Sequence, residues 1–193
     1  MKSNGSKLCT AQPNRQKLIK GFLSLELGIV LLVVAGLIAG AVMYYRDNVR
    51  KTSINTNMSQ VQKTAANLRM KYGSTNQFLQ ATTANAVRSS VIPAELRDGS
   101  ASTASNAFGS AIVVAVDSLT GTSDAAKFNW GNVPSNQCSD IVSGTAGEFR
   151  KITVAGADVK ALDSTLNLTT LETQCESAGV GGNVSLVFWV GRS

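Results

Sequence analysis

The chain has 193 residues, which is enough for one domain and an additional segment but not for two full domains. It contains no His and only three Cys, which excludes a Ser-His-Asp triad, an imidazole metal site and a zinc-ribbon set of cysteines. Only 16% of its residues are charged, a low share for a fully soluble domain that indicates a buried or membrane-embedded stretch.

The positive charge is concentrated at the start of the chain. The net charge is +6, but five of the 18 basic residues lie in residues 1–21, which contain no acid. The rest of the chain is close to neutral, with 13 basic and 12 acidic residues. A surface that releases counterions from nucleic-acid phosphates needs a larger basic excess, so we expect no nucleic-acid partner.

An apolar segment follows this basic leader. In residues 22–45 the only strongly polar side chains are Ser24 and Glu26, and residues 27–43 are all aliphatic, Gly or Met. Roughly 20 apolar residues span a bilayer as a helix. The positive-inside rule places the leader in the cytoplasm and the rest of the chain on the outer side. Two simpler interpretations compete, a plain signal anchor and a secretory signal peptide cut after Ala41.

Glu26 argues against both simpler interpretations. An ionisable carboxylate in a membrane helix is costly unless it has a partner, and a signal peptide has no use for one. The alternative is that this single acid, near a helix end, reaches the headgroup region of the bilayer.

The residues after the apolar segment predict an amphipathic helix. Apolar residues recur there at alternating spacings of four and three, which is a heptad-like helical period; they are Ile54, Met58, Val61, Ala65, Leu68 and Tyr72. The intervening positions are polar, and Gly73 is a plausible C-terminal stop. We therefore expect one unbroken helix over residues 22–72, whose second half packs on a globular head. The alternative is a coiled-coil dimer.

Beyond Gly73 the sequence predicts a β-rich head. Residues 74–109 form a polar connection with helical potential around residues 78–87. Strands rich in β-branched and aromatic residues are expected at residues 111–117, 127–133, 149–155 and 184–190. The last of these is nearly all apolar and is expected at the centre of the sheet. Short helices are expected at residues 138–142, capped by the preceding Pro-Ser-Asn, and at residues 166–175.

Two cysteines lie in the part of the chain expected outside the cytoplasm, Cys138 and Cys175, whereas Cys9 lies in the leader. Because disulfides form in oxidising compartments, we expect Cys138 and Cys175 to be bonded. The bond would close a loop of about 38 residues and restrict the unfolded chain by roughly 4 kcal/mol. The alternative is two separate free thiols.

Nothing in the sequence identifies a catalytic centre. No nucleophile elbow, phosphate loop or paired-carboxylate motif is recognisable, and we expect no enzymatic activity, cofactor or metal. Asp158 and Asp163 are a candidate acidic pair, although a solvated loop explains them more simply. Trp130 and Trp189 are candidate binding aromatics, although their strand-like surroundings favour packing. An exported enzyme or binding protein behind a signal peptide is the alternative from a different class.

The junction between the leader and the apolar segment resembles the class III leader of type IV prepilins. In that family a basic leader ends in Gly, the mature chain opens with a hydrophobic residue, and its fifth residue is Glu. Gly21, Phe22 and Glu26 match these positions. Further stretches that resemble the family, and in particular its type IVb subclass, are residues 31–40, Ile92-Pro93, residues 106–109 and the late cysteines Cys138 and Cys175.

The resemblance implies the type IV pilin fold, an α+β fold in which a long N-terminal helix packs on an antiparallel sheet. It implies that a prepilin peptidase cuts between Gly21 and Phe22 and that the new N-terminus of Phe22 is methylated. The chain would then consist of a removed leader at residues 1–21, an apolar transmembrane or filament-core half-helix at residues 22–45, an amphipathic half-helix at residues 46–73 and a head at residues 74–193.

Cleavage gives Glu26 a partner. It removes the five positive charges of the leader and creates an α-amine on Phe22, four residues before Glu26. Between staggered neighbouring helices, Glu26 of one subunit can approach the Phe22 amine of another, and this pairing would set the register of a filament. Small residues allow helix backbones to approach closely; those in this segment are Gly28, Gly36 and Gly40.

The resemblance further implies a structural protein, the major pilin of a type IVb pilus. The precursor would lie in the inner membrane, and the mature chain would form an extracellular homo-oligomeric filament for adhesion, aggregation, motility or mating contact. Its partners would be the prepilin peptidase, the inner-membrane assembly machinery and a host or bacterial cell surface. The nearest alternative is a minor pilin or a type II secretion pseudopilin, which shares the junction but usually lacks the late disulfide.

Overall fold

The protein is described here by a computed structural model covering residues 15–74, 77–100 and 102–192, with side chains from Leu27 onward. The chain divides into two compact units, Met1–Asn48 and Val49–Ser193. The first unit contains the N-terminal part of helix α1, whose bounds are Arg15–Leu68. The helix thus begins seven residues before Phe22, within the segment predicted to be the leader. Cys9 lies outside the described residues.

The end of α1 differs from the unbroken α-helix that the sequence predicts. After Leu68 the chain makes one turn of π-helix, η1 (Arg69–Gly73), closed by a 3.2 Å hydrogen bond from the amide of Ser74 to the carbonyl of Arg69. Such single wide turns interrupt or end α-helices, and apolar periodicity does not reveal them. The expected stop at Gly73 is nevertheless where the helical turns end.

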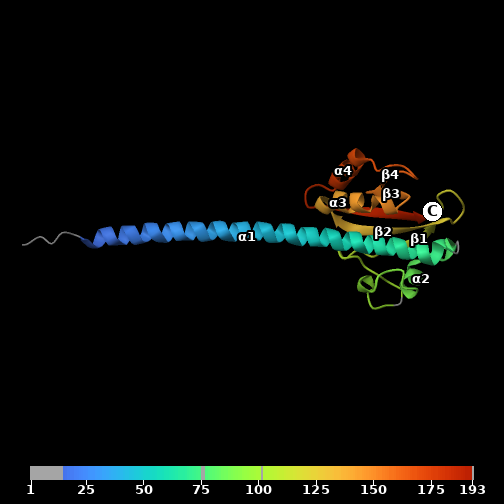
Figure 1. Ribbon diagram of the computed structural model, residues 1–193, viewed down its shortest axis with the longest axis horizontal. Helices are drawn as coiled ribbons and strands as arrows, with labels where there is room; N and C mark the ends of the chain where they lie inside the picture. The colour runs from blue at the N-terminus through green and yellow to red at the C-terminus, as the bar shows by residue number, and fades with distance from the viewer. Residues whose placement is uncertain (1–14, 75–76, 101, 193) are drawn as a thin grey trace, which may run out of the picture. The chain divides into compact units, whose positions relative to one another are not determined.

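The second unit is built on a five-stranded antiparallel sheet (Figure 1). Its strands are β1 (Val114–Asp117), β2 (Ala125–Pro134), β3 (Lys151–Val154), β4 (Ala157–Lys160) and β5 (Asn183–Gly191). They lie in the order β1-β2-β5-β3-β4. The nearly all-apolar C-terminal strand is therefore central, as the sequence predicts, and it joins the β1-β2 pair to the β3-β4 hairpin.

Two strands differ from the sequence prediction. Strand β1 starts at Val114, because the residues before it bond elsewhere: the amide of Ile112 donates to the carbonyl of Ala104 at 2.8 Å. Strand β4 was not predicted. It is short and follows a two-residue turn in which Ala155 and Gly156 both have positive φ, 50° and 86°. A turn of that geometry closes a tight hairpin. Gly, Asn and Asp are the residues typical of such turns, so Ala155 does not predict it from sequence.

Short helices complete the second unit. The long connection after η1 contains η2 (Phe78–Gln80), α2 (Thr83–Arg88) and η3 (Ala94–Leu96). Helices α3 (Ser135–Thr145), η4 (Ala146–Glu148) and α4 (Leu168–Glu176) come later. Asn167 caps α4 by accepting from the amide of Thr170 at 3.0 Å. The expected side-chain cap on α3 is absent, since its N-cap position is Pro134.

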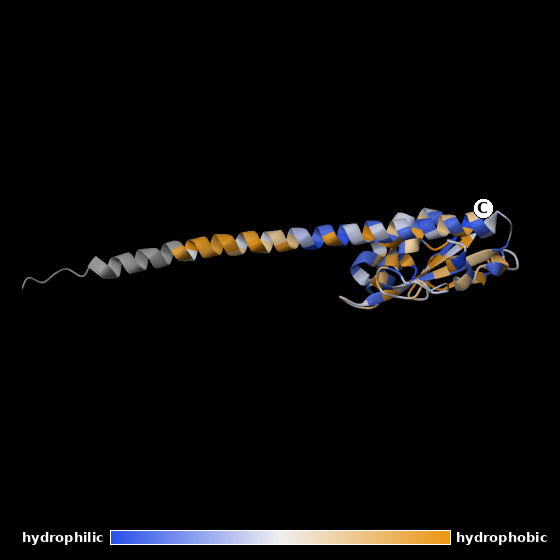
Figure 2. Ribbon diagram, turned by 90° about the horizontal axis from the view of Figure 1, so that it is seen from below, coloured by the Kyte–Doolittle hydropathy of each residue, from blue (hydrophilic) through white to orange (hydrophobic). Residues whose placement is uncertain are grey.

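The core of the second unit lies between α1 and one face of the sheet. The predicted apolar stripe of α1 is buried, with Val61, Ala65 and Leu68 fully covered. Facing it are fully buried residues of the central strands, among them Phe128, Trp130, Ile152, Leu186 and Phe188. Packing on the head is therefore confirmed, and the coiled-coil alternative is wrong because the stripe is filled from within the same chain. Figure 2 shows orange strands in this unit beside the largely blue and white C-terminal part of α1.

The outer edge of the sheet at β1 is partly closed by a side chain. The hydroxyl of Thr83 accepts from the amide of Val114 at 3.0 Å and donates to its carbonyl at 3.3 Å. Both backbone groups of Val114 that face away from β2 are thus satisfied. Unpaired edge groups are a template for unwanted strand pairing, so this contact limits pairing at β1.

Candidate functional site

The first candidate surface is the apolar helix of the first unit. Every side chain from Leu27 to Asn48 is exposed. Within the described chain one helix is long and apolar enough, by length and composition alone, to cross a bilayer, and none of its most apolar window is buried. That test by itself is weak, because signal sequences also pass it.

The free energy gained by burying these apolar side chains shows that this surface needs a partner. Eleven large aliphatic side chains between Leu27 and Met43 are exposed. At about 1.5–3 kcal/mol for each buried side chain, covering them is worth on the order of 20–30 kcal/mol. That exceeds the whole stability of a typical domain, about 5–15 kcal/mol. A bilayer or other apolar helices must therefore cover this segment.

The predicted cleavage and pairing residues lie in the N-terminal part of α1. Gly21, Phe22 and Glu26 fall within the bounds of the helix, but their side chains lie outside the described residues. Their roles in cleavage, methylation and register remain predictions.

The three predicted packing glycines have no close neighbours among the described residues. A Cβ atom placed on Gly28, Gly36 or Gly40 would meet nothing within 4 Å. The intramolecular contacts of the described chain thus do not require small residues at these positions. Close approach of a second helix would require them, and that role stays a prediction.

In the second unit, polar contacts fix α1 to α3. The guanidinium of Arg50 donates to the carbonyl of Asn136 and to the carboxylate of Asp140, the latter at 3.2 Å. Ser53 donates to the amide oxygen of Gln137 at 3.1 Å. Exposed ion pairs contribute little alone, but these contacts orient α3 beside the helix.

A buried hydrogen bond joins α1 to the sheet. Asn57 and Trp130 are both fully buried, and the indole N–H donates to the Asn57 amide oxygen at 3.1 Å. The Asn57 amide group also donates to the carbonyl of Ser53 at 2.8 Å. Nearby, Gln60 is buried, and its Oε1 has no hydrogen-bond partner in the part of the chain that the structure describes. Because an unpaired buried indole N–H costs free energy, this bond favours one rotation of α1 over the sheet.

The buried bond shows the role of Trp130, and it involves a helix residue whose burial the sequence does not predict. Trp130 is a packing residue, as its strand-like surroundings favoured. The sequence places Asn57 and Gln60 among the polar positions between the apolar ones, but the structure buries both. The only signal that could have found Asn57 is the need of a buried Trp for an acceptor.

The sheet face away from α1 carries a row of polar side chains around Trp189. The Trp189 indole N–H donates to Asp117 at 2.8 Å, and Lys127 lies 2.9 Å from the same carboxylate. Lys151 lies over the Trp189 ring, 5.2 Å from its centre, and pairs with Asp158 at 3.1 Å. Trp189 is thus held by neighbours within the chain. These contacts favour a packing role on the sheet surface over a role as a binding residue.

Asp117, Asp158 and Asp163 each have a cation of their own within the head. Partial burial alone would raise the pKa of Asp117, but the hydrogen bonds from Trp189 and Lys127 outweigh it and lower that pKa below its ordinary value. The hydrogen bonds of Asp163 with Arg150 lower the Asp163 pKa in the same way. Asp158 pairs with Lys151 instead. The candidate pair Asp158 and Asp163 is therefore wrong, because each carboxylate has its own cation.

The two late cysteines form a disulfide that connects α3 to α4. Cys138 and Cys175 are buried and bonded, with 5.6 Å between their Cα atoms and a sequence separation of 37. Besides this bond, α4 packs on the sheet through the buried Leu171. Within the described residues, no group of three or more Cys, Asp or Glu is placed to hold a metal ion.

Comparison with known families identifies one match. Residues 51–190 match the profile of a family described as PilS N terminal. The matched region covers most of the chain and includes both disulfide cysteines and all of the sheet except Gly191, the last residue of β5. No curated protein sequence matches the chain.

Comparison with solved structures finds similar folds at low sequence identity. The crystal structure of a type IVb pilin from Salmonella typhi has a TM-score of 0.52 and 19% identity, covering 69% of this chain and 97% of that chain. TcpA, a type IV pilin from Vibrio cholerae El Tor biotype, has a TM-score of 0.45 and 17% identity, covering 69% and 98%. An NMR structure of the type IVb pilin PilS from Salmonella typhi has a TM-score of 0.42 and 20% identity, covering 70% and 94%.

Proposed function

The chain belongs to the PilS family of type IVb pilins, and from this we propose that it is the major subunit of a type IVb pilus. A pilin of this family is a structural subunit and not an enzyme. The observation that carries the proposal is the uncovered apolar segment from Leu27 to Met43. A bilayer covers this segment in the precursor, and the helices of other subunits cover it in the filament.

The proposed sequence of events starts in the inner membrane. The leader at residues 1–21 stays in the cytoplasm, and prepilin peptidase hydrolyses the peptide bond between Gly21 and Phe22. Water adds to the Gly21 carbonyl, so that Gly21 ends in a carboxylate and Phe22 gains an α-amine, which is then methylated. Removing the five leader cations lowers the cost of drawing the helix out of the bilayer.

Glu26 then acts as the register residue of assembly. Its carboxylate in an apolar surrounding is tolerable once the Phe22 amine of a neighbouring subunit lies beside it, because a buried charge is costly only while it is unpaired. Gly28, Gly36 and Gly40 allow neighbouring helices to approach. The disulfide between Cys138 and Cys175 favours a pilus subunit over a pseudopilin, which usually lacks it.

Cell-surface filaments test the proposal. Sheared surface protein should begin at Phe22 with a methylated N-terminus by mass spectrometry, and electron microscopy should show filaments that contain this chain along their length. A start at Val42 would indicate a signal peptide, and a start at Met1 an uncut anchor. Sparse labelling of filaments built from another protein would indicate a minor pilin.

A variant pair tests the register role. Glu26→Ala should be cleaved normally, since Gly21 and Phe22 are intact, but should form few or no filaments. Glu95→Ala, at an exposed acid on η3 in the head, is the control and should assemble like the wild type. Normal filaments from a fully processed Glu26→Ala variant would refute the pairing.

A further inference from the structure

A glycine-built turn between α4 and β5 presents one apolar side chain to solvent. Val180 is completely exposed, the most exposed large hydrophobic residue among those described. Gly179 and Gly181 on either side have φ of 73° and 78°, a left-handed conformation that favours glycine. A Cβ on Gly182 would lie 2.1 Å from the carbonyl oxygen of Ala178. The backbone of this Val180 turn, residues 177–182, therefore depends on all three glycines.

Hydrogen bonds hold the Val180 turn in place. The amide of Gly182 donates to the carbonyl of Gly179 at 3.1 Å, which closes the turn around Val180. Ser135, at the start of α3, donates its amide to the Gly182 carbonyl at 2.9 Å and its hydroxyl to the Gly179 carbonyl at 3.2 Å. A pre-ordered turn loses little conformational entropy on binding. Val180 is thus a preformed apolar knob.

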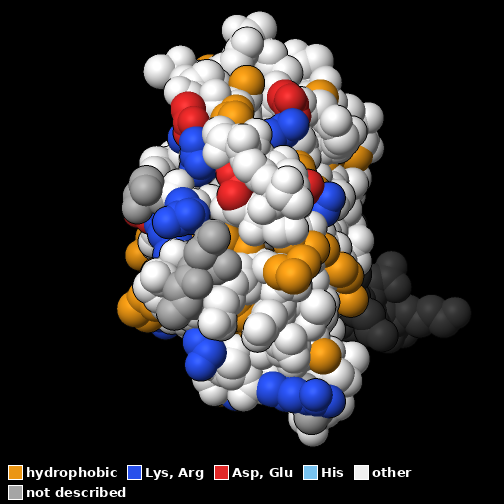
Figure 3. Space-filling model, turned by 90° about the vertical axis from the view of Figure 1, so that its right-hand side faces the viewer, with side chains coloured by type: hydrophobic (Ala, Val, Ile, Leu, Met, Phe, Trp, Pro, Cys, Tyr) orange, Lys and Arg blue, Asp and Glu red, His pale blue; other side chains and the backbone are white. Residues whose placement is uncertain are grey.

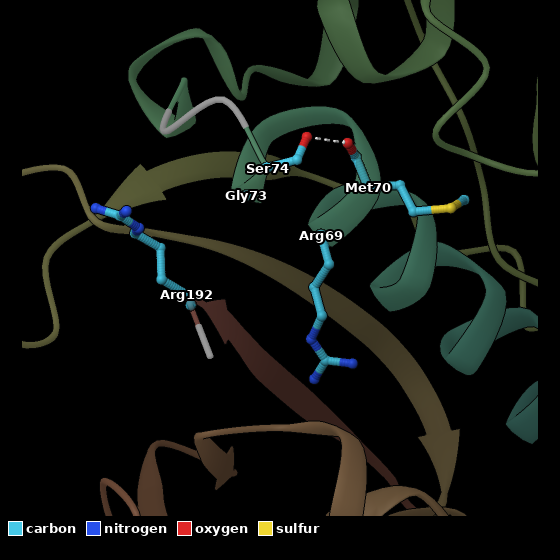
Figure 4. A pocket seen from close by; sticks show the side chains of 6 residues that line it. Arg69, Met70, Gly73, Ser74 and Arg192 are labelled. Atoms are coloured by element: carbon cyan, nitrogen blue, oxygen red, sulfur yellow. Dashed lines mark hydrogen bonds between the residues drawn. The ribbon is translucent and has the colours of Figure 1, made fainter.

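The opposite end of β5 carries a depression of about 380 Å³. It is lined by Arg69, Met70, Gly73, Ser74, Gly191 and Arg192. Figure 4 shows Arg192 on one side of it and Arg69 with Met70 on the other. Met70 is largely exposed, at 68%, although it is apolar. Figure 3, which looks onto this end of the head, shows small apolar patches among both basic and acidic side chains.

The two features cannot meet within one subunit. The Val180 turn precedes the first residue of β5, Asn183, and the depression contains its last, Gly191. Nine strand residues at about 3.3 Å each separate them by roughly 30 Å. A knob at one end and a socket at the other make a heterologous contact, which produces an open helical filament where the rotation between copies does not close a ring.

Charge favours the same contact. Glu176 lies one residue before the Val180 turn, is exposed, and its side chain makes no hydrogen bond or ion pair among the described residues. The guanidinium of Arg192 beside the depression is likewise exposed and without a partner in the described part of the chain. One end of β5 thus offers a free carboxylate beside the apolar Val180, and the other a free guanidinium beside a depression that contains the exposed Met70.

We propose that the Val180 turn of one subunit inserts into the Arg69–Arg192 depression of another copy of this chain in the pilus, with Glu176 paired to Arg192. The inference rests on the proposed function, because it requires a filament. It assigns the heads a head-to-tail contact in addition to the packing of the apolar helices.

Polar and charge-reversal substitutions test the contact in cells that express the full chain. Val180→Ser should lower the yield of sheared filaments by roughly tenfold, equivalent to about 1.4 kcal/mol per contact. Glu176→Arg and Arg192→Glu should each lower it, and the double variant should recover much of the loss. Two matched controls on α4 should leave the yield unchanged. Leu168→Ser, at an exposed apolar residue, is the control for Val180→Ser, and Glu172→Arg is the control for Glu176→Arg.

Cross-linking tests the geometry directly. In isolated filaments of Val180→Cys/Met70→Cys, a short bis-maleimide should produce a ladder of covalent multimers, whereas Leu168→Cys/Met70→Cys should give monomers. Normal filament yield from Val180→Ser together with no ladder overturns this contact. If, in that case, Glu26→Ala still abolishes filament formation, the head contact is wrong and the proposed function holds without it. If the wild-type chain forms no filaments, both proposals fail.

Discussion

The buried bond between Asn57 and Trp130 offers the sharpest test of how the helix is fixed to the sheet. Replacing Asn57 by Ala removes the acceptor of the indole N–H, and both residues are fully buried. Leaving a buried donor unpaired costs about 1–3 kcal/mol. Ala is a better helix former than Asn by roughly 0.5–0.7 kcal/mol, which opposes part of this loss.

A second asparagine on the same helix supplies the control. Asn55 lies two residues away and is exposed, so Asn55→Ala gains the helix propensity and loses no buried bond. We therefore expect Asn57→Ala to be about 2 kcal/mol less stable than Asn55→Ala. For a chain of this size that difference lowers Tm by about 4–8 °C.

The measurement is thermal and urea unfolding of the mature chain in detergent micelles, followed by near-ultraviolet circular dichroism. The double variant Asn57→Leu/Trp130→Phe should be less destabilised than the sum of its single variants, because it removes both polar groups. Equal stability of Asn57→Ala and Asn55→Ala would refute the argument that this bond fixes the helix.

Two further predictions concern the head. Cys138→Ser/Cys175→Ser should lose about 4 kcal/mol of unfolding free energy, because the bond joins residues separated by 37 positions, and an equal midpoint in urea for oxidised and double-variant protein would contradict this. Asp117 and Asp163 have lowered folded-state pKa values, so their contribution is present above the unfolded pKa of about 3.9 and is lost as pH falls through the folded pKa. Unfolding free energy measured from pH 6 to 2 should therefore fall less steeply in Asp117→Asn than in the wild type, and parallel curves would show that its pairing does not stabilise the head.

Much of the architecture follows from one-dimensional patterns. Four of the five strands, helices α3 and α4 and the buried face of α1 are visible as periodicity, β-branched content and turn residues. Strand β4 is not, because its four residues, Ala157–Lys160, are too few to show alternation and include two charges. The π-turn at Arg69–Gly73 is missed because its sequence continues an α-helical period.

The candidate functional residues also divide into those that the sequence reveals and those that only the structure brings together. The junction of Gly21, Phe22 and Glu26 and the apolar run after it are contiguous in sequence, so the chemistry proposed for them is a prediction from sequence alone. The Val180 turn and the Arg69–Arg192 depression cannot. The turn depends on the left-handed backbone of Gly179 and Gly181, and the depression brings together residues more than a hundred positions apart.

The sequence by itself determined that a helix must leave water, that a basic leader precedes it, and that a disulfide-bearing β-rich head follows. Hydrophobic transfer and charge act on contiguous residues, so their outcome depends little on the fold. Only the tertiary structure decided that Asn57 is buried against Trp130 and that Asp158 and Asp163 have separate cations. Those pairings depend on how strands and helices distant in sequence are brought within hydrogen-bonding distance.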